Sequence, residues 1–153
     1  MQAGWEQAMS NVMAGLTGLN MVYEAAGMHA SLLGFCHESL ILGDDLLGQA
    51  MRCVRGIEVN EETVGIETMR DTCLGGPGHY LGSDQTLSLM QTEYFYPVLA
   101  DRNSPKEWDE KNRPDLLQNA ILRKETLINS PTPATLNPVL DAKIRERFKI
   151  HLA

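Results

Sequence analysis

The sequence predicts a mainly helical protein with one or two short β-strands. In several separate segments, apolar residues recur at the three- and four-residue spacing that places them on one helix face. One short apolar run, in residues 20–26, is a candidate buried strand, although a single strand cannot form a sheet by itself. Glycine and proline concentrate between these segments, above all in residues 75–82, where they exclude regular structure.

The first half of the chain is expected to hold two long helices. The first spans residues 3–17, ends at Gly18, and carries its large apolar residues on one face: Trp5, Met9, Val12, Met13 and Leu16. The candidate strand at residues 20–26 and a loop at 27–34 follow. The second helix spans residues 39–54. Its Gly43 and Gly48 each lower helix stability by ~1 kcal/mol relative to alanine, which suggests that each permits close contact with another helix.

The second half is expected to contain shorter helices with clear start signals. Asn60 is a good N-cap for a helix that ends at Gly75, and Ser83 or Asp84 can cap the next. Ser104, Pro105 and Glu107 have the spacing of a capping box. The predicted helices cover residues 61–74, 84–92, a short segment from 104, 114–128 and 139–151. The proline-rich residues 130–138 form a linker or wrapped loop.

Composition excludes several function classes. The formal net charge is −7 and the pI is about 5.0, which argues against nucleic acid and anionic membrane surfaces as partners. The three cysteines lack zinc-site or disulfide-framework spacing. No signal peptide is recognisable, and no apolar run approaches the ~20 residues that cross a bilayer. A cytoplasmic location with reduced thiols is expected, with most of the methionines in the core.

Three places stand out as candidate sites. His79 and Tyr80 lie in the glycine-rich loop between two helices, where a titratable ring could take part in chemistry. Glu24 follows the candidate strand, and the carboxyl end of a strand is where parallel barrels keep their functional groups. Glu24 could equally pair with a neighbour or face solvent. His29, among apolar residues, could be a packing residue or a ligand, and Asp45 is expected to face solvent.

Three segments also resemble one family. GGPGHYLGSDQTLSLMQTEYFYPVLADRNSPKEW, residues 75–108, resembles the C-terminal part of the trimethylamine:corrinoid methyltransferase family. GIEVNEETVGIETM (residues 56–69) and QAGWEQAMSNVMAGLTGLNMVYEAAGM (residues 2–28) resemble neighbouring segments of the same proteins. The likeness runs in order along nearly the whole chain and corresponds to the final third of the family's longer members.

This resemblance implies a fold and an activity. The chain is expected to be the C-terminal part of a (β/α)8 barrel of the TIM type, with the last barrel units in residues 1–92 and a helical extension in residues 93–153. The implied reaction moves a methyl group from a tertiary or quaternary methylated amine to the cobalt of a corrinoid. That methylcobamide is carried by a separate partner protein, so no cofactor is expected to bind this chain directly.

The resemblance also implies site residues. His79 and Glu24 are the expected catalytic residues. The expected substrate-binding residues, whose rings could attract or contact an ammonium group, are Tyr23, His29, Tyr80 and Tyr94. Gly76 and Gly78 would let the corrinoid approach the loop. The family's reactive position, a pyrrolysine in some members, falls just upstream of Gln2, so the chain alone is expected to be inactive.

Two further expectations concern assembly. Apolar faces shaped for strands outside the chain should lead to a homo-oligomer. The alternative is a non-catalytic helical interaction module, or an inactive remnant of such an enzyme, that binds a partner protein.

Overall fold

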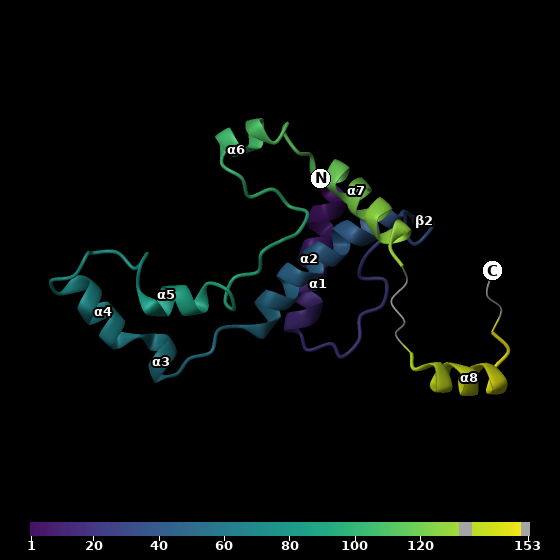
Figure 1. The fold of residues 1–153 in the computed structure, drawn as a ribbon, viewed down its shortest axis with the longest axis horizontal. Coiled ribbons are helices and arrows are strands. Elements are labelled where there is room, and N and C mark those ends of the chain that lie inside the picture. The colour runs from purple at the N-terminus through teal and green to yellow at the C-terminus, as the bar shows by residue number, and fades with distance from the viewer. Residues whose placement is uncertain (132–135, 151–153) are drawn as a thin grey trace.

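The computed structural model describes residues 1–131 and 136–150. Figure 1 shows α1, α2 and α7 together at the centre, with α3, α4 and α5 forming an arm on one side. The elements in chain order are α1 (Gln2–Leu16), β1 (Met28–His29), β2 (Gly34–Phe35), α2 (His37–Arg55), α3 (Glu61–Val64), α4 (Ile66–Cys73), α5 (Asp84–Leu89), α6 (Pro105–Glu110), α7 (Leu116–Asn129) and α8 (Pro138–Arg147). The mainly helical class with short strands is confirmed.

Side-chain caps explain where the shorter helices begin. Asn60 Oδ1 accepts from the Thr63 amide at 2.8 Å, and Ser83 accepts from the amide of Thr86. The predicted capping box at Ser104 is present, with Pro105 in the first turn of α6. These polar residues satisfy amide groups that a helix start leaves without partners. The predicted starts of α3, α5 and α6 are therefore confirmed.

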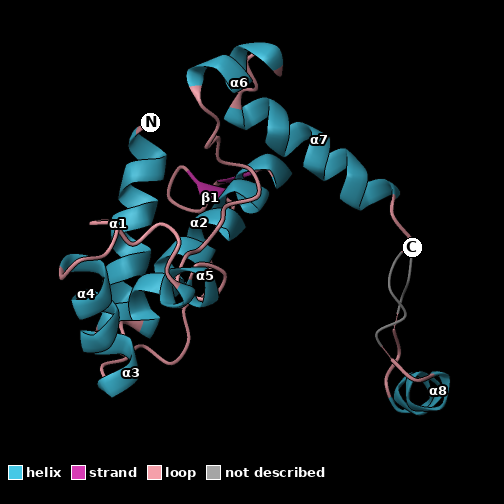
Figure 2. Cartoon of the chain, turned by 60° about the vertical axis from the view of Figure 1, so that its left-hand side comes forward, coloured by secondary structure: helices cyan, strands magenta, loops and turns pink. Residues whose placement is uncertain are grey.

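The predicted strand at residues 20–26 is wrong. These residues form bends, and Glu24 adopts a positive φ of 57°. The short strands lie in the stretch expected to be a loop, where β1 and β2 pair antiparallel. Figure 2 draws β1 in magenta. Within the described residues no strand pairs with residues 20–26, so Val22 and Tyr23 stay 45% and 76% exposed. The barrel itself stays a prediction.

Several helix boundaries also differ from the prediction. Gly65 adopts the left-handed conformation, with φ of 62°, and divides the predicted helix 61–74 into α3 and α4. A glycine takes this conformation without the steric cost that other residues meet. Helix α5 ends at Leu89 rather than at residue 92, and α8 ends at Arg147. The last predicted helical residue, His151, lies outside the described residues.

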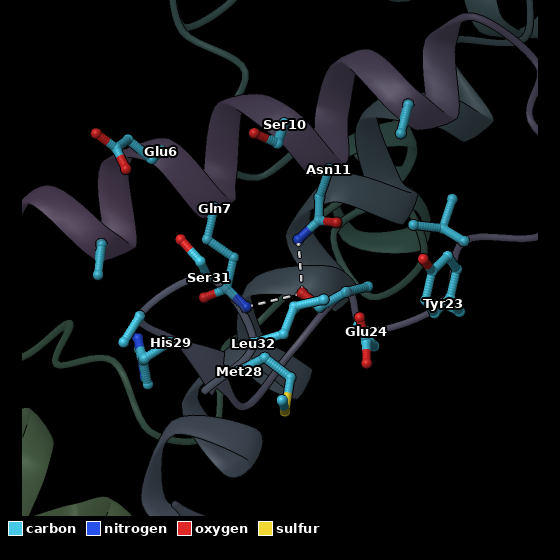
Figure 3. Close-up of a pocket in the computed structure, with 15 residues that line it drawn as sticks. Glu6, Gln7, Ser10, Asn11, Tyr23, Glu24, Met28, His29, Ser31 and Leu32 are labelled. Carbon is cyan, nitrogen blue, oxygen red and sulfur yellow. Dashed lines mark hydrogen bonds between the residues drawn. The ribbon is translucent and has the colours of Figure 1, made fainter. Parts of the chain in front are cut away.

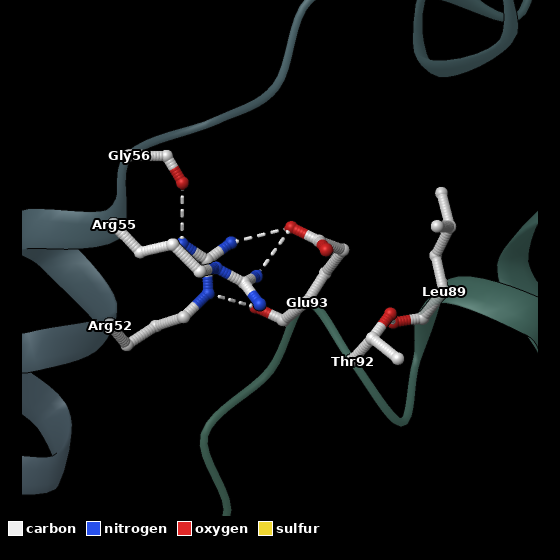
Figure 4. A network of polar contacts seen from close by, with 6 residues as sticks. All are labelled: Arg52, Arg55, Gly56, Leu89, Thr92 and Glu93. Carbon is white, nitrogen blue, oxygen red and sulfur yellow. Dashed lines mark hydrogen bonds and ion pairs between the residues drawn. The ribbon is translucent and has the colours of Figure 1, made fainter.

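Residues 93–99, called the strap, run along α2 and are held at one end by an ion-pair network (Figure 4). Arg52 donates through Nε to the Glu93 carbonyl at 2.6 Å and through a guanidinium nitrogen to Glu93 Oε2 at 2.8 Å. Arg55 donates to the same Glu93 Oε2 at 2.8 Å. The strap is thus anchored to the C-terminal turns of α2.

Two more contacts hold the strap along the helix. Gly48 faces the ring of Phe95, and a Cβ at Gly48 would overlap that ring. Asp45 Oδ1 accepts from the Val98 amide at 2.8 Å, so Asp45 does not simply face solvent as expected. Positions 45, 48 and 52 lie on one face of α2, which is why one straight segment can contact all three. The sequence predicts a close helix contact at Gly48, whereas the structure places the Phe95 ring of the strap there.

Very little apolar surface is buried. Among the described residues, the buried apolar side chains are Ala50, Leu99 and Ala120. The apolar face predicted for α1 is largely in solvent, with Trp5 70% exposed. Six methionines, expected mostly in the core, are instead exposed: Met1, Met9, Met13, Met21, Met51 and Met69. Such extensive apolar exposure is typical of surfaces that another segment or chain covers.

Candidate functional site

A hollow of about 490 Å³ lies between α1 and the loop that follows it (Figure 3). Helix α1 contributes Glu6, Gln7 and Asn11, and the loop contributes residues from 22 to 32. Three of the candidate residues lie in it together: Tyr23, Glu24 and His29. We call it the α1 hollow.

Two amide side chains fix the loop against α1. Gln7 Nε2 and Asn11 Nδ2 both donate to the carbonyl oxygen of Ala25, at 2.8 Å and 3.0 Å, as Figure 3 shows. The two residues are four positions apart, so their side chains share a helix face. Their common acceptor sets the position of the adjacent Glu24.

The loop backbone is strained on both sides of this anchor. Four residues other than glycine have positive φ values of 51–69°, and all line the hollow: Glu24, Ala30, Ser31 and Leu32. This conformation costs on the order of 1 kcal/mol or more per residue, and strain of this kind concentrates at functional sites. The anchored loop therefore holds Glu24 in a conformation that its own backbone does not favour.

The charge in the hollow favours a cation. Glu6 and Glu24 contribute carboxylates, and neither lysine nor arginine lines it in the part of the chain that is described. His29 Nε2 lies 2.6 Å from Ser39 Oγ, which in turn accepts a hydrogen bond from Cys36 Sγ at 3.0 Å. Tyr23 adds an aromatic ring, whose face attracts alkylammonium groups. A small organic cation fits this chemistry.

The glycine-rich loop forms a second, separate place. His79 lines a hollow of about 390 Å³ that also includes Asp71 and Asp84. The Tyr80 hydroxyl lies 3.7 Å from Cys73 Sγ; this contact, aided by burial, raises the pKa of Tyr80 above its ordinary value. His79 and Tyr80 are thus not brought into the α1 hollow.

The loop glycines have a conformational role. Gly78 has φ of 74° and donates its amide to the Thr72 carbonyl at 3.1 Å. A Cβ at Gly76 would overlap the carbonyl oxygen of Asp71. Both glycines therefore allow the chain to turn tightly around the C-terminal end of α4.

Tyr94 lies in a third place, on the strap. Its ring centroid is 6.3 Å from that of Tyr96, with an interplanar angle of 43°.

Sequence reasoning missed Glu6, Gln7 and Asn11 of the α1 hollow. Gln7 and Asn11 could have been recognised as two amides one helical turn apart, away from the apolar face of α1.

Two kinds of site are absent from the described ranges. No group of three or more histidine, cysteine or acidic side chains there is arranged to hold a metal ion. None of the described helices combines the length and the hydropathy needed to cross a membrane.

Comparison with known proteins gives the class and the family. The chain is similar to glycine betaine methyltransferase of Desulfitobacterium hafniense strain Y51, with 28% identity over 144 residues, 94% of this chain and 29% of that protein. It is 30% identical over 148 residues to trimethylamine methyltransferase MttB1 of Methanosarcina mazei, covering 97% of this chain and 28% of the relative. MttB of Methanosarcina barkeri strain Fusaro is 29% identical over 129 residues, 84% of this chain and 25% of its own length.

These relatives are methyltransferases by name, which defines the class. The model of the family described as trimethylamine methyltransferase (MTTB) matches residues 1–150, so the chain belongs to that family. The resemblance recognised in the sequence is confirmed. The chain spans only 25–29% of the length of these three relatives.

Proposed function

We propose that this chain is the C-terminal portion of a methyltransferase that moves a methyl group from a methylated amine to the cobalt of a corrinoid on a separate protein. The amine is tertiary or quaternary. The chain itself contributes part of the amine-binding surface and does not bind the corrinoid directly. Membership of the trimethylamine methyltransferase family is the observation that carries this proposal.

The α1 hollow supports the amine end of the proposal. A methylated ammonium group cannot donate the several hydrogen bonds that a protonated primary amine can, so its recognition depends on ring faces and negative charge. Tyr23 and Glu24 supply both on the same loop. In the proposed reaction these two residues hold the ammonium group, and the anchoring of Ala25 by Gln7 and Asn11 orients them.

The exposed apolar surface supports the incomplete-barrel part of the proposal. Trp5, Met9 and Met13 lie on one face of α1 and are all exposed. In the complete polypeptide, this face would pack against barrel elements that the chain lacks. We therefore propose that the isolated chain has no methyltransferase activity.

The test uses the full-length polypeptide with a corrinoid protein. Methylation of reduced cobalt changes the visible absorption spectrum of the corrinoid, so transfer can be followed directly with trimethylamine, tetramethylammonium, choline and glycine betaine. We expect methylation from at least one of them and its loss in Glu24→Ala. If cobalt methylation occurs with none of the methylated amines offered, the proposal fails.

A second candidate function is a non-catalytic interaction module. The exposed methionines favour it, because methionine-rich surfaces adapt to protein partners. The two functions differ in what the full-length polypeptide does: a module binds a partner without any cobalt methylation, whatever amine is offered.

A further inference from the structure

Given the proposed function, on which this step rests, we infer that the α1 hollow selects methylated amines without a carboxylate over betaines, and that Glu6 is the specificity-determining residue. The family comparison does not decide this point. One relative is named for glycine betaine and the others for trimethylamine, and their identities to this chain lie within 28–30%.

The hollow has two ends that differ in their side chains. Figure 3 shows Tyr23 and Glu24 toward one end, and Glu6 and His29 toward the other. An ammonium group held at the Tyr23 end directs its remaining substituent along the hollow. That substituent determines which methylated amine fits, because the methyl groups are common to all of them.

The end that receives the substituent is unsuited to an anion. Glu6 carries the negative charge there, and its Oε1 accepts a hydrogen bond from Gln2 Nε2 at 2.8 Å, which restrains the carboxylate. No lysine or arginine among the described residues lines the hollow to offset this charge. His29 Nε2 is already 2.6 Å from Ser39 Oγ.

A betaine would therefore place its carboxylate in the field of Glu6. A hydroxyl substituent avoids that repulsion and can donate a hydrogen bond to a carboxylate or to the Ser10 hydroxyl, which also lines the hollow. Choline and glycine betaine form a matched pair for this comparison, because a hydroxymethyl group in one replaces the carboxylate of the other.

The experiment compares this pair on the full-length polypeptide with its corrinoid protein. We expect kcat/KM to be higher for choline than for glycine betaine, and Glu6→Gln to lower that ratio by ~3- to 10-fold, the effect of one nearby like charge in a partly solvated site. Calorimetric Kd values for the two ligands should shift in the same ratio. Gln keeps the acceptor for Gln2, so the local structure is retained.

Glu125→Gln is the matched control, because Glu125 is exposed on α7 and does not line the hollow. This variant also removes one negative charge, and it should leave the choline-to-betaine ratios of kcat/KM and of Kd unchanged. The role of Glu6 would be overturned if the wild-type protein preferred glycine betaine, or if Glu6→Gln and Glu125→Gln shifted the choline-to-betaine ratio equally. Either result would leave methyl transfer itself intact. The proposed function is tested separately. If no amine supports methyl transfer but Glu6→Gln still shifts the ratio of the Kd values, the proposed function is refuted and the binding preference is retained.

Discussion

At the scale of single residues, the carbonyl of Ala25 concentrates the contacts that shape the α1 hollow. It accepts from both Gln7 and Asn11, so removing one donor leaves the other in place. A single hydrogen bond of this kind contributes ~1 kcal/mol, equivalent to roughly a fivefold change in a local opening equilibrium. Both donors together should fix the loop more strongly than either alone.

Asn11→Ala should therefore loosen the loop without unfolding the molecule. Amide hydrogen exchange in residues 22–32 should become ~5-fold faster, as expected for the loss of one hydrogen bond. Ser10→Ala, one position away in α1, is the control and should leave exchange unchanged. Unaltered exchange in Asn11→Ala would show that the anchor does not hold the loop.

At the scale of secondary-structure elements, α2 contacts each of its neighbours through a different kind of group. It packs on α1 and α7, and its Gly48 receives the Phe95 ring of the strap. Helix α7 is joined to it by an ion pair between Lys124 Nζ and Glu38 Oε1 at 2.7 Å. Each contact predicts a distinct response to mutation or to pH.

Gly48→Ala should destabilise the molecule, although alanine normally stabilises a helix by ~1 kcal/mol relative to glycine. The new Cβ would overlap Phe95, so the ring and the strap must move. Gly4→Ala in α1 is the control, because that site faces open space and should show the ordinary gain. Urea denaturation measures both, and a gain in Gly48→Ala would exclude the close contact with Phe95.

The ion pair between α2 and α7 predicts a pH dependence. The hydrogen bond from Lys124 is the largest cause that lowers the pKa of Glu38, and the same bond raises the pKa of Lys124. The contribution of Glu38 is present above its unfolded pKa and is lost as pH falls through its folded pKa. The contribution of Lys124 is present below its unfolded pKa and is lost as pH rises through its folded pKa.

Wild-type stability relative to Glu38→Gln should thus be greatest across the neutral range and decline at both acidic and strongly alkaline pH. Urea midpoints measured against pH for both proteins give this difference. The difference should be small, because both side chains stay partly exposed, at 26% for Lys124 and 23% for Glu38. A constant difference across the acidic range would contradict a stabilising pair.

At the scale of the whole molecule, exposed apolar surface is the dominant feature. The isolated 17.0 kDa chain should self-associate, because covering such surface is favourable in water. Size-exclusion chromatography with light scattering should show a mass above that of the monomer that rises with concentration, together with binding of a hydrophobic dye. A monomer that binds no dye would favour a self-sufficient module over part of a barrel.

Local chemistry made several elements predictable from the sequence. The capping groups at Asn60, Ser83 and Ser104 act on amides within the next three residues, so their effect needs no tertiary contact. The same holds for the helix end at Gly18, where glycine adopts a positive φ without steric cost. The family was also accessible, because its motifs lie in continuous segments of the chain.

The strand at residues 20–26 could not be judged from sequence in the same way. A strand needs a neighbour with free amide and carbonyl groups, and that neighbour is defined by the fold and not by the segment. Without one, Glu24 takes a left-handed conformation and the Ala25 carbonyl turns to α1. Likewise, the separation of His79 from Glu24 depends on where distant helices lie.

The sequence by itself thus determined the mainly helical class, several helix caps and the family, because these depend on short-range bonds and on motifs read in order. Only the tertiary structure decided that Tyr23, Glu24 and His29 share a hollow with Glu6, and that Asp45, Gly48 and Arg52 hold the strap. The physical reason is that a hollow and a helix-to-strap contact both join residues far apart in the chain, whose proximity no local spacing encodes.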